Sequence, residues 1–221
     1  MIQPGPTPLP PHAGRPVRTA GVPLDRATAA MILVHGRGAT AESILELSRV
    51  LARPGVAFLA PQAAGGSWYP QSFLAPIASN EPGISSGLSV IDALVSAVAA
   101  AGVPAERTIL LGFSQGGCLA SEYVARRGAR LGGLAALSGG LIGPDGTPRD
   151  YAGDLAGTPV FLGCSDVDFH IPRERVELTA EVLGRMGAAV DMRLYPGMGH
   201  TVNQDEIERV LAMLDEAGAR A

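Results

Sequence analysis

Residues 108–127 read TILLGFSQGGCLASEYVARR, and this stretch decides the fold. The apolar run at its start is typical of a buried strand, and the second half has the spacing of a helix. Between them, Gly112-Phe113-Ser114-Gln115-Gly116 has the pattern G-x-S-x-G, which marks a tight strand-to-helix turn carrying a serine nucleophile. Such a turn forces the serine into a strained backbone conformation, and the two glycines avoid collisions there. The stretch therefore predicts that Ser114 projects into a cleft.

The same alternation of short apolar runs and helical stretches extends over the rest of the chain. Runs that are apolar on both faces are typical of parallel strands buried in a sheet, and strand–helix alternation implies helices on both faces of that sheet. We therefore predict an α/β fold with a mainly parallel central sheet. The predicted strands are residues 31–34, 56–60, 108–111, 134–137, 160–162 and 190–195, and the predicted helices are residues 42–52, 86–101, 115–127, 173–186 and 204–217.

A serine hydroxyl needs a general base, and the chain has only four histidines. His12 lies in a proline-rich segment and His35 directly follows the first predicted buried strand. His170 precedes Ile-Pro at a helix start, where a capping or packing role suffices. His200 follows the last strand through the turn PGMG and comes after Ser114 in the chain, as expected for this fold. We predict His200 as the base.

The acid that orients the base is expected between the serine and the histidine in sequence. The strand at 160–162 leads into Gly163-Cys164-Ser165-Asp166-Val167-Asp168. Both Asp166 and Asp168 could reach the imidazole, and the spacing alone leaves the two open.

An acyl-transfer reaction also needs two N–H donors for the oxyanion. The backbone N–H of Gln115, the residue after the nucleophile, is the first candidate. The second is the N–H of Arg37 in His35-Gly36-Arg37-Gly38, where glycines let the backbone approach a substrate. The Arg37 side chain is expected to face solvent. This chemistry requires no metal and no organic cofactor.

Composition limits the other classes of function. The 221 residues suit one domain, and we divide them into a proline-rich N-terminal arm, residues 1–16, and a single domain, residues 17–221. The net charge is −4, and the sequence has no block of basic residues that would bind nucleic acid. The absence of lysine excludes phosphate-loop, Schiff-base and Ser-Lys chemistry. Without a signal-like start or an apolar run of ~20 residues, we expect a cytoplasmic protein with no membrane span and with buried, reduced cysteines.

Four ordered motifs together resemble the phospholipase/carboxylesterase family of α/β-hydrolases, which includes acyl-protein thioesterases and small bacterial carboxylesterases. They are His35-Gly36 with Arg37, GFSQGG at 112–117, the D-x-x-[VI]-P segment at 168–172 and the G-x-G-H turn at 197–200. The resemblance runs from about Met31 to Leu214. Aligned from Pro172, it places the catalytic acid on Asp168, although a forward reading from Gly163 favours Asp166. We choose Asp168.

The chain departs from the thioesterase pattern in the loop GGSWYPQSFLAPIASNEPG, residues 65–83. It carries Trp68, Tyr69, Phe73 and Leu74, which we predict to be substrate-binding. They form either the wall of an acyl or alcohol pocket or a hydrophobic plug that anchors the loop.

The resemblance implies an α/β-hydrolase with no large lid, which favours short, soluble esters. The leading hypothesis is a serine carboxylesterase that acts on a small-molecule ester through an acyl-enzyme. Acyl-protein thioesterase and lysophospholipase activity would use the same residues, and a non-catalytic binding module of the same fold is a third alternative. The family also makes a homodimer possible, but no apolar stripe in the sequence identifies an interface.

Overall fold

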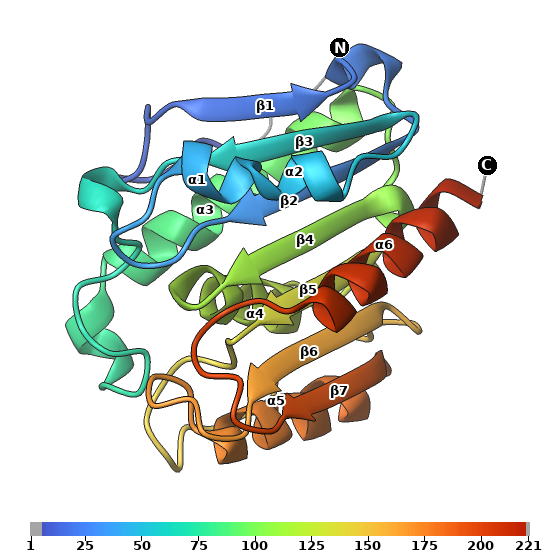
Figure 1. Cartoon of the computed structure of the whole chain (residues 1–221). Helices are drawn as coiled ribbons and strands as arrows, with labels where there is room; N and C mark the ends of the chain where they lie inside the picture. The colour runs from blue at the N-terminus through green and yellow to red at the C-terminus, as the bar shows by residue number, and fades with distance from the viewer. Residues whose placement is uncertain (1–5, 220–221) are drawn as a thin grey trace.

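A single sheet of seven strands forms the centre of the protein, in the computed structural model that describes residues 6–219. The strand order is β1-β3-β2-β4-β5-β6-β7, and all neighbours are parallel except β1, which pairs antiparallel with β3 (Figure 1). The strands are β1 (Val17–Gly21), β2 (Ala29–Val34), β3 (Val56–Pro61), β4 (Thr108–Phe113), β5 (Gly133–Leu137), β6 (Pro159–Ser165) and β7 (Ala189–Tyr195).

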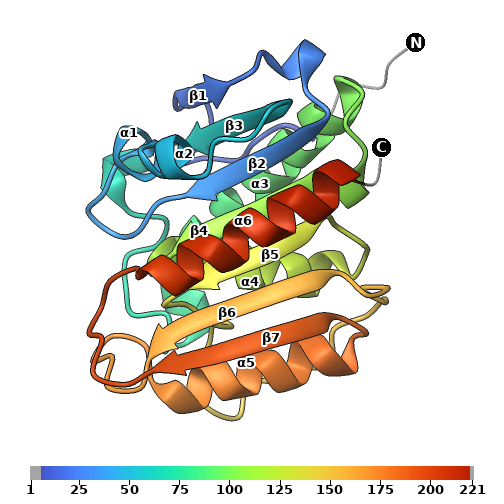
Figure 2. The same cartoon turned by 45° about the vertical axis from the view of Figure 1, so that its right-hand side comes forward.

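Helices cover both faces of this sheet, as predicted. One face carries α1, α2 and α6, and the other carries α3, α4 and α5 (Figures 1 and 2). The α-helices are α1 (Ala41–Leu45), α2 (Leu47–Val50), α3 (Gly83–Ala100), α4 (Gln115–Arg127), α5 (Arg173–Arg185) and α6 (Gln204–Ala219). Short 3-10 helices are η1 (Leu24–Arg26), η2 (Ala64–Gly66), η3 (Ile77–Asn80) and η4 (Ala105–Arg107).

The core lies in two layers, one on each side of the sheet. Alternation along β2 assigns Ile32 and Val34 to the layer under α3, α4 and α5, and Met31 and Leu33 to the layer under α1 and α6. All four side chains are fully buried. A strand buried on both faces must be apolar throughout, which explains why the central strands were recognisable from sequence.

Two elements differ from the prediction. Strand β1 was not predicted because its sequence, VRTAG, has no apolar run and is mostly exposed at the edge of the sheet. Arg18 on this strand forms an ion pair with Glu42, and a charged edge is a common protection against further strand pairing. The helix predicted at residues 42–52 is two short helices, α1 and α2, which meet at Glu46.

Helix α3 has the length and apolar composition of a membrane-crossing segment, with 18 residues and a mean hydropathy of 1.6. Half of it is buried inside the protein, where Ile84, Ile91, Val95 and Val98 pack into the core. Packing against the sheet and α4 accounts for this composition. It is the one such helix among residues 6–219.

Most of the described part of the proline-rich arm lies exposed on the surface, but His12 does not. Its ring is buried, where Nε2 donates to the carbonyl of Trp68 at 2.9 Å and Nδ1 accepts from the N–H of Ala64 at 3.0 Å. The His12 N–H donates to the hydroxyl of Ser86 in α3. Burial is the main cause that lowers the pKa of His12 below 6.5, so the ring is held neutral. Residues 6–16 are thereby fixed to the domain, and residues 1–5 of the arm lie outside the described residues.

We predict that His12→Phe lowers the free energy of unfolding by about 2 kcal/mol, because the Ala64 N–H and the Trp68 carbonyl each lose a buried partner. Urea denaturation at pH 8 measures this change. Arg15→Gln, an exposed change in the same arm, is the control and should leave the midpoint unaltered. An unchanged midpoint for His12→Phe would show that the arm is not anchored through this ring.

Candidate active site

Ser114 occupies a strained turn between β4 and α4, with φ 55° and ψ −120°. Its N–H donates to the carbonyl of Leu137, and its own carbonyl accepts from the N–H of Cys118. A Cβ on Gly112 would lie 2.3 Å from the carbonyl oxygen of Gly116, and a Cβ on Gly116 would lie 2.0 Å from the carbonyl oxygen of Val34. Both contacts are impossible for any other residue, so the two glycines permit the turn.

The loop after β2 lies directly beside this serine. A Cβ on Gly36 would be only 3.3 Å from the Cβ of Ser114. Within residues 6–219, no hydrogen-bond acceptor is found for the backbone N–H of Arg37 or for that of Gln115, the first residue of α4. Two unpaired N–H groups therefore flank Ser114, one of them at a helix N-terminus, where the dipole favours negative charge.

His200 and Asp168 form a close pair at the ends of β6 and β7. His200 Nδ1 lies 2.7 Å from Asp168 Oδ2, and the Asp168 side chain is fully buried while that of His200 is 16% exposed. Burial acts to raise the pKa of Asp168, but hydrogen bonds from His200 and from the N–H groups of His170 and Ile171 outweigh it and lower the pKa below 3.8. The carboxylate is therefore charged and fixes the imidazole with Nε2 free to act on a proton.

Asp166 has a different place in the structure. Its carboxylate accepts from the N–H of Gly197 at 2.8 Å and so holds the turn that leads to His200. Ser165 Oγ holds the same turn by accepting from Gly199 N–H at 3.1 Å. The spacing alone left both aspartates open and the family resemblance favoured Asp168; of the two, only Asp168 contacts the imidazole.

His170 takes part in the site, which the sequence did not indicate. Its backbone N–H donates to Asp168 Oδ1, and no side chain caps the start of α5. Its ring, however, packs edge-on against His200 at 4.7 Å between centroids, and the Phe113 ring lies tilted against His200 at 4.9 Å. Two aromatic rings therefore restrict the orientation of the His200 imidazole.

Ser114 and His200 line one cavity of about 480 Å³. Its other walls come from the loop after β2, the segment at 69–73, the start of α4 and the loop before α5. The lining residues are Gly36, Arg37, Ala39, Tyr69, Pro70, Gln71, Ser72, Phe73, Phe113, Ser114, Gln115, Cys118, His170, Ile171 and His200. Phe113, Cys118, His170 and Ile171 are therefore lining residues that the prediction did not include: two lie beside the nucleophile turn and two lie in the loop before α5.

The structure places the four loop residues that were predicted to bind substrate in two different positions. Tyr69 and Phe73 line the cavity, whereas Trp68 and Leu74 lie outside its lining. Trp68 is fully buried in the core, and its Nε1 donates to the carbonyl of His35 at 2.9 Å. Leu74 is partly buried and packs against the same core. These two side chains form the hydrophobic plug, which was the second interpretation of the loop.

A buried polar network ties this loop to the nucleophile turn. The Gln115 side chain accepts from the N–H of Trp68 and donates to the carbonyl of Tyr69, both at 2.8 Å. His35 Nδ1 donates to the carbonyl of Gly36, and His35 Nε2 accepts from the N–H of Ala63. Burial is the largest cause that lowers the pKa of His35 below 6.5. Gln115 and His35 therefore position the backbone around Ser114 through their side chains.

Both cysteines are buried, free thiols, as expected. Burial is the main reason that the pKa of Cys118 and that of Cys164 rise to about 12, so neither thiol is a nucleophile near neutral pH. Among residues 6–219, no group of three or more His, Cys, Asp or Glu side chains could hold a metal ion.

Glu206 is an unusual carboxyl behind the site, at the start of α6. It is fully buried, and one oxygen accepts from the N–H of Asn203 while the other has no partner among the described residues. That second oxygen lies against Gly163, where a Cβ would be 2.2 Å away. Burial is the main cause that raises the pKa of Glu206 from 4.5 to about 7.

Comparison with known proteins agrees with this geometry. The family described as phospholipase/carboxylesterase matches residues 21–217. A crystal structure of a phospholipase/carboxylesterase from Dyadobacter fermentans is 42% identical with a TM-score of 0.87, and the match covers 91% of this chain and 96% of that chain. The chain therefore belongs to the phospholipase/carboxylesterase family of α/β-hydrolases, a class of hydrolytic enzymes.

Among curated relatives, two fungal proteins named acyl-protein thioesterase 1 are similar. The protein from Neurospora crassa is 26% identical over 216 residues, which cover 86% of this chain and 87% of the relative. The protein from Gibberella zeae is 34% identical over 119 residues, which cover 51% of this chain and 49% of the relative. The match thus spans about half the length of the second relative.

We predict that Glu206→Gln removes a pH dependence of stability. The carboxyl has a higher pKa in the folded state, so its contribution to stability is full below about pH 4.5 and is lost as the pH rises through about 7. The difference amounts to about 3 kcal/mol. Thermal melts at pH 5 and pH 8 should therefore show a gain for the variant mainly at pH 8.

The matched control is Glu208→Gln, two positions further along α6 and exposed. Comparison of each variant with wild type at the same pH cancels the opposite pH dependence that neutral, buried His12 and His35 contribute below about pH 6.5. An equal effect of Glu206→Gln at both pH values would mean that the carboxyl is not protonated in the folded protein.

Proposed function

We propose that this protein is a serine carboxylesterase. One observation carries the proposal: Ser114, strained on its turn, and His200, held at 2.7 Å by the buried Asp168, line the same cavity. In this mechanism Ser114 Oγ attacks the ester carbonyl while His200 Nε2 takes the hydroxyl proton. His200 then gives that proton to the leaving alcohol, and a serine-bound acyl group remains.

Hydrolysis of the acyl-enzyme repeats these steps with water. His200 takes a proton from the water, the hydroxide attacks the acyl carbonyl, and Ser114 leaves with the proton returned by His200. Asp168 keeps the imidazole in the required tautomer and stabilises its positive form. The N–H groups of Arg37 and Gln115 are the proposed oxyanion donors in both steps. The proposed reaction needs no metal and no organic cofactor.

We propose short-chain esters as the substrates. A cavity of about 480 Å³ is partly lined by Tyr69 and Phe73, and no inserted domain interrupts the strand–helix alternation of residues 17–219. Acyl-protein thioesterase or lysophospholipase activity is the second candidate, and the similarity to the Neurospora crassa thioesterase over 86% of this chain supports it. Both candidates use the same catalytic residues and differ in the acyl group accepted.

The buried free thiols suit a reducing compartment, and we propose a cytoplasmic location. The proposed partner is a small-molecule ester. A homodimer stays a prediction.

We expect p-nitrophenyl acetate and butyrate to be hydrolysed with a higher kcat/KM than the octanoate and palmitate esters. Ser114→Ala should lower kcat by roughly a thousandfold or more, because the nucleophile is lost, and should melt at the wild-type temperature or above it. A fluorophosphonate should add its mass to the Ser114 peptide of wild type alone. A preference for palmitate would favour the thioesterase or lysophospholipase. The absence of both turnover and labelling would mean that the protein is a binding module.

We predict that Asp168→Asn lowers kcat by roughly 10²–10⁴, because an amide that donates to Nδ1 would hold the wrong tautomer of His200. Asp166→Asn should have little effect on kcat, since its carboxylate only caps the turn at Gly197. Steady-state kinetics with p-nitrophenyl butyrate measures both, and circular dichroism checks that both fold. Equal losses in the two variants would remove the distinction between the aspartates.

A further inference from the structure

The charged side chains in the lining of the active-site cavity are basic. Its lining contains no aspartate and no glutamate, and it contains one permanent cation, Arg37. The other titratable side chains in the lining are the rings of His170 and His200, the phenol of Tyr69 and the thiol of Cys118. Asp168 lies outside the lining, bonded to His200, and four hydrogen-bond donors stabilise its charge. Although the protein has a net negative charge, no carboxylate lines its active-site cavity.

The Arg37 guanidinium is held in place but not neutralised. Nη1 donates to the carbonyl of Pro70 at 2.9 Å, Nη2 donates to the carbonyl of Gln71 at 2.5 Å, and the group lies 5.9 Å from the centre of the Tyr69 ring. Pro70, Gln71 and Tyr69 all line the cavity, so the cation lies on this wall.

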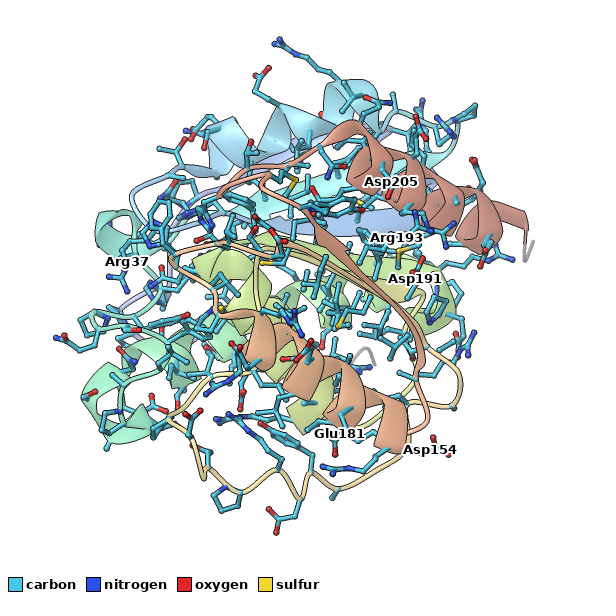
Figure 3. All side chains as sticks on the ribbon, turned by 60° about the horizontal axis from the view of Figure 1, so that its bottom comes forward. Arg37, Asp154, Glu181, Asp191, Arg193 and Asp205 are labelled. Carbon is cyan, nitrogen blue, oxygen red and sulfur yellow. The ribbon has the colours of Figure 1, made fainter. Side chains whose placement is uncertain are left out.

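No carboxylate among residues 6–219 forms an ion pair with Arg37. Figure 3 shows it at the edge of the molecule, far from the labelled carboxylates of Asp191, Asp205 and Glu181. Carbonyl contacts use two of the five N–H donors of a guanidinium, so three can still bind a ligand. A fixed guanidinium with its charge unpaired is suited to a carboxylate.

We propose that Arg37 binds a carboxylate carried by the ester substrate, so that the preferred substrate is an anionic ester. The inference rests on the proposed esterase function and narrows its substrate class. The backbone N–H of the same residue is the proposed oxyanion donor. The carboxylate must therefore lie within one arginine side-chain length of the ester carbonyl, which selects short half-esters of dicarboxylic acids or esters of short hydroxy acids.

A purely structural role of Arg37 would give a different result. If the guanidinium only fastened the segment at Pro70 and Gln71, its loss would slow the hydrolysis of charged and neutral esters alike. If it binds the substrate, its loss would selectively slow the hydrolysis of the charged ester. The ratio of kcat/KM for a matched pair of esters therefore separates the two roles.

The test compares monomethyl glutarate with methyl valerate, in which a methyl group replaces the carboxylate. A second pair, 4-acetoxybenzoate and its methyl ester, places the carboxylate on the alcohol side. Wild type should prefer the anionic member of at least one pair by roughly tenfold, the size of one charge-assisted hydrogen bond. Because the guanidinium is exposed, the preference should shrink between 0.05 and about 1 M NaCl.

Three variants assign the preference to Arg37. Arg37→Gln should reduce the ratio to about one or below, and Arg37→Lys, which keeps the charge without the fork geometry, should retain part of it. Arg185→Gln removes an exposed charge that is paired with Glu181 on α5 and should leave the wild-type ratio.

The proposal fails if wild type prefers neither anionic ester, or if Arg37→Gln keeps the wild-type ratio. Hydrolysis of p-nitrophenyl acetate distinguishes failure of the Arg37 proposal from failure of the proposed esterase function. Its hydrolysis without an anionic preference would overturn the role of Arg37 alone. If neither it nor the other four esters is hydrolysed, and Ser114 is not labelled, both proposals fall.

Discussion

The close approach of α4 to the end of β2 is the constraint on which the site depends. A side chain on Gly116 would collide with the backbone of Val34, so the helix can begin beside this strand only with a glycine there. This contact fixes the strained turn at Ser114 and brings the loop at Gly36 within van der Waals distance of it. The nucleophile and both candidate oxyanion N–H groups are therefore placed by backbone packing.

Neutral, buried polar side chains hold this arrangement from behind. His12 and His35 both pack against Trp68, with each ring centre 5.1 Å from that of the indole. Each imidazole accepts a backbone N–H through one nitrogen, and Gln115 links the same loop to the turn. Protonation of either imidazole would remove an acceptor in the interior, so the lowered pKa values and the hydrogen bonds have the same origin.

Much of the fold could be predicted because the central strands are apolar on both faces and the turn at Ser114 has a glycine pattern with a steric cause. Strand β1 could not be predicted, since an exposed edge strand needs no apolar pattern. His170 was assigned a capping or packing role because its neighbours in sequence suffice to explain it, and its contact with His200 depends on how two loops meet. The role of Trp68 was ambiguous because the same apolar residue types form both a buried plug and the wall of a pocket.

The sequence by itself determined the parallel sheet, the nucleophile turn and the order of serine, acid and histidine, since local sterics and hydrophobic periodicity act over a few residues. The family resemblance favoured Asp168 over Asp166, but only the tertiary structure shows that Asp168 contacts His200 and that Arg37 lies on the cavity wall without an ion-pair partner among residues 6–219. These features depend on distances between loops that are far apart in the chain. Such distances follow from the packing of the whole domain, which no short stretch of sequence encodes.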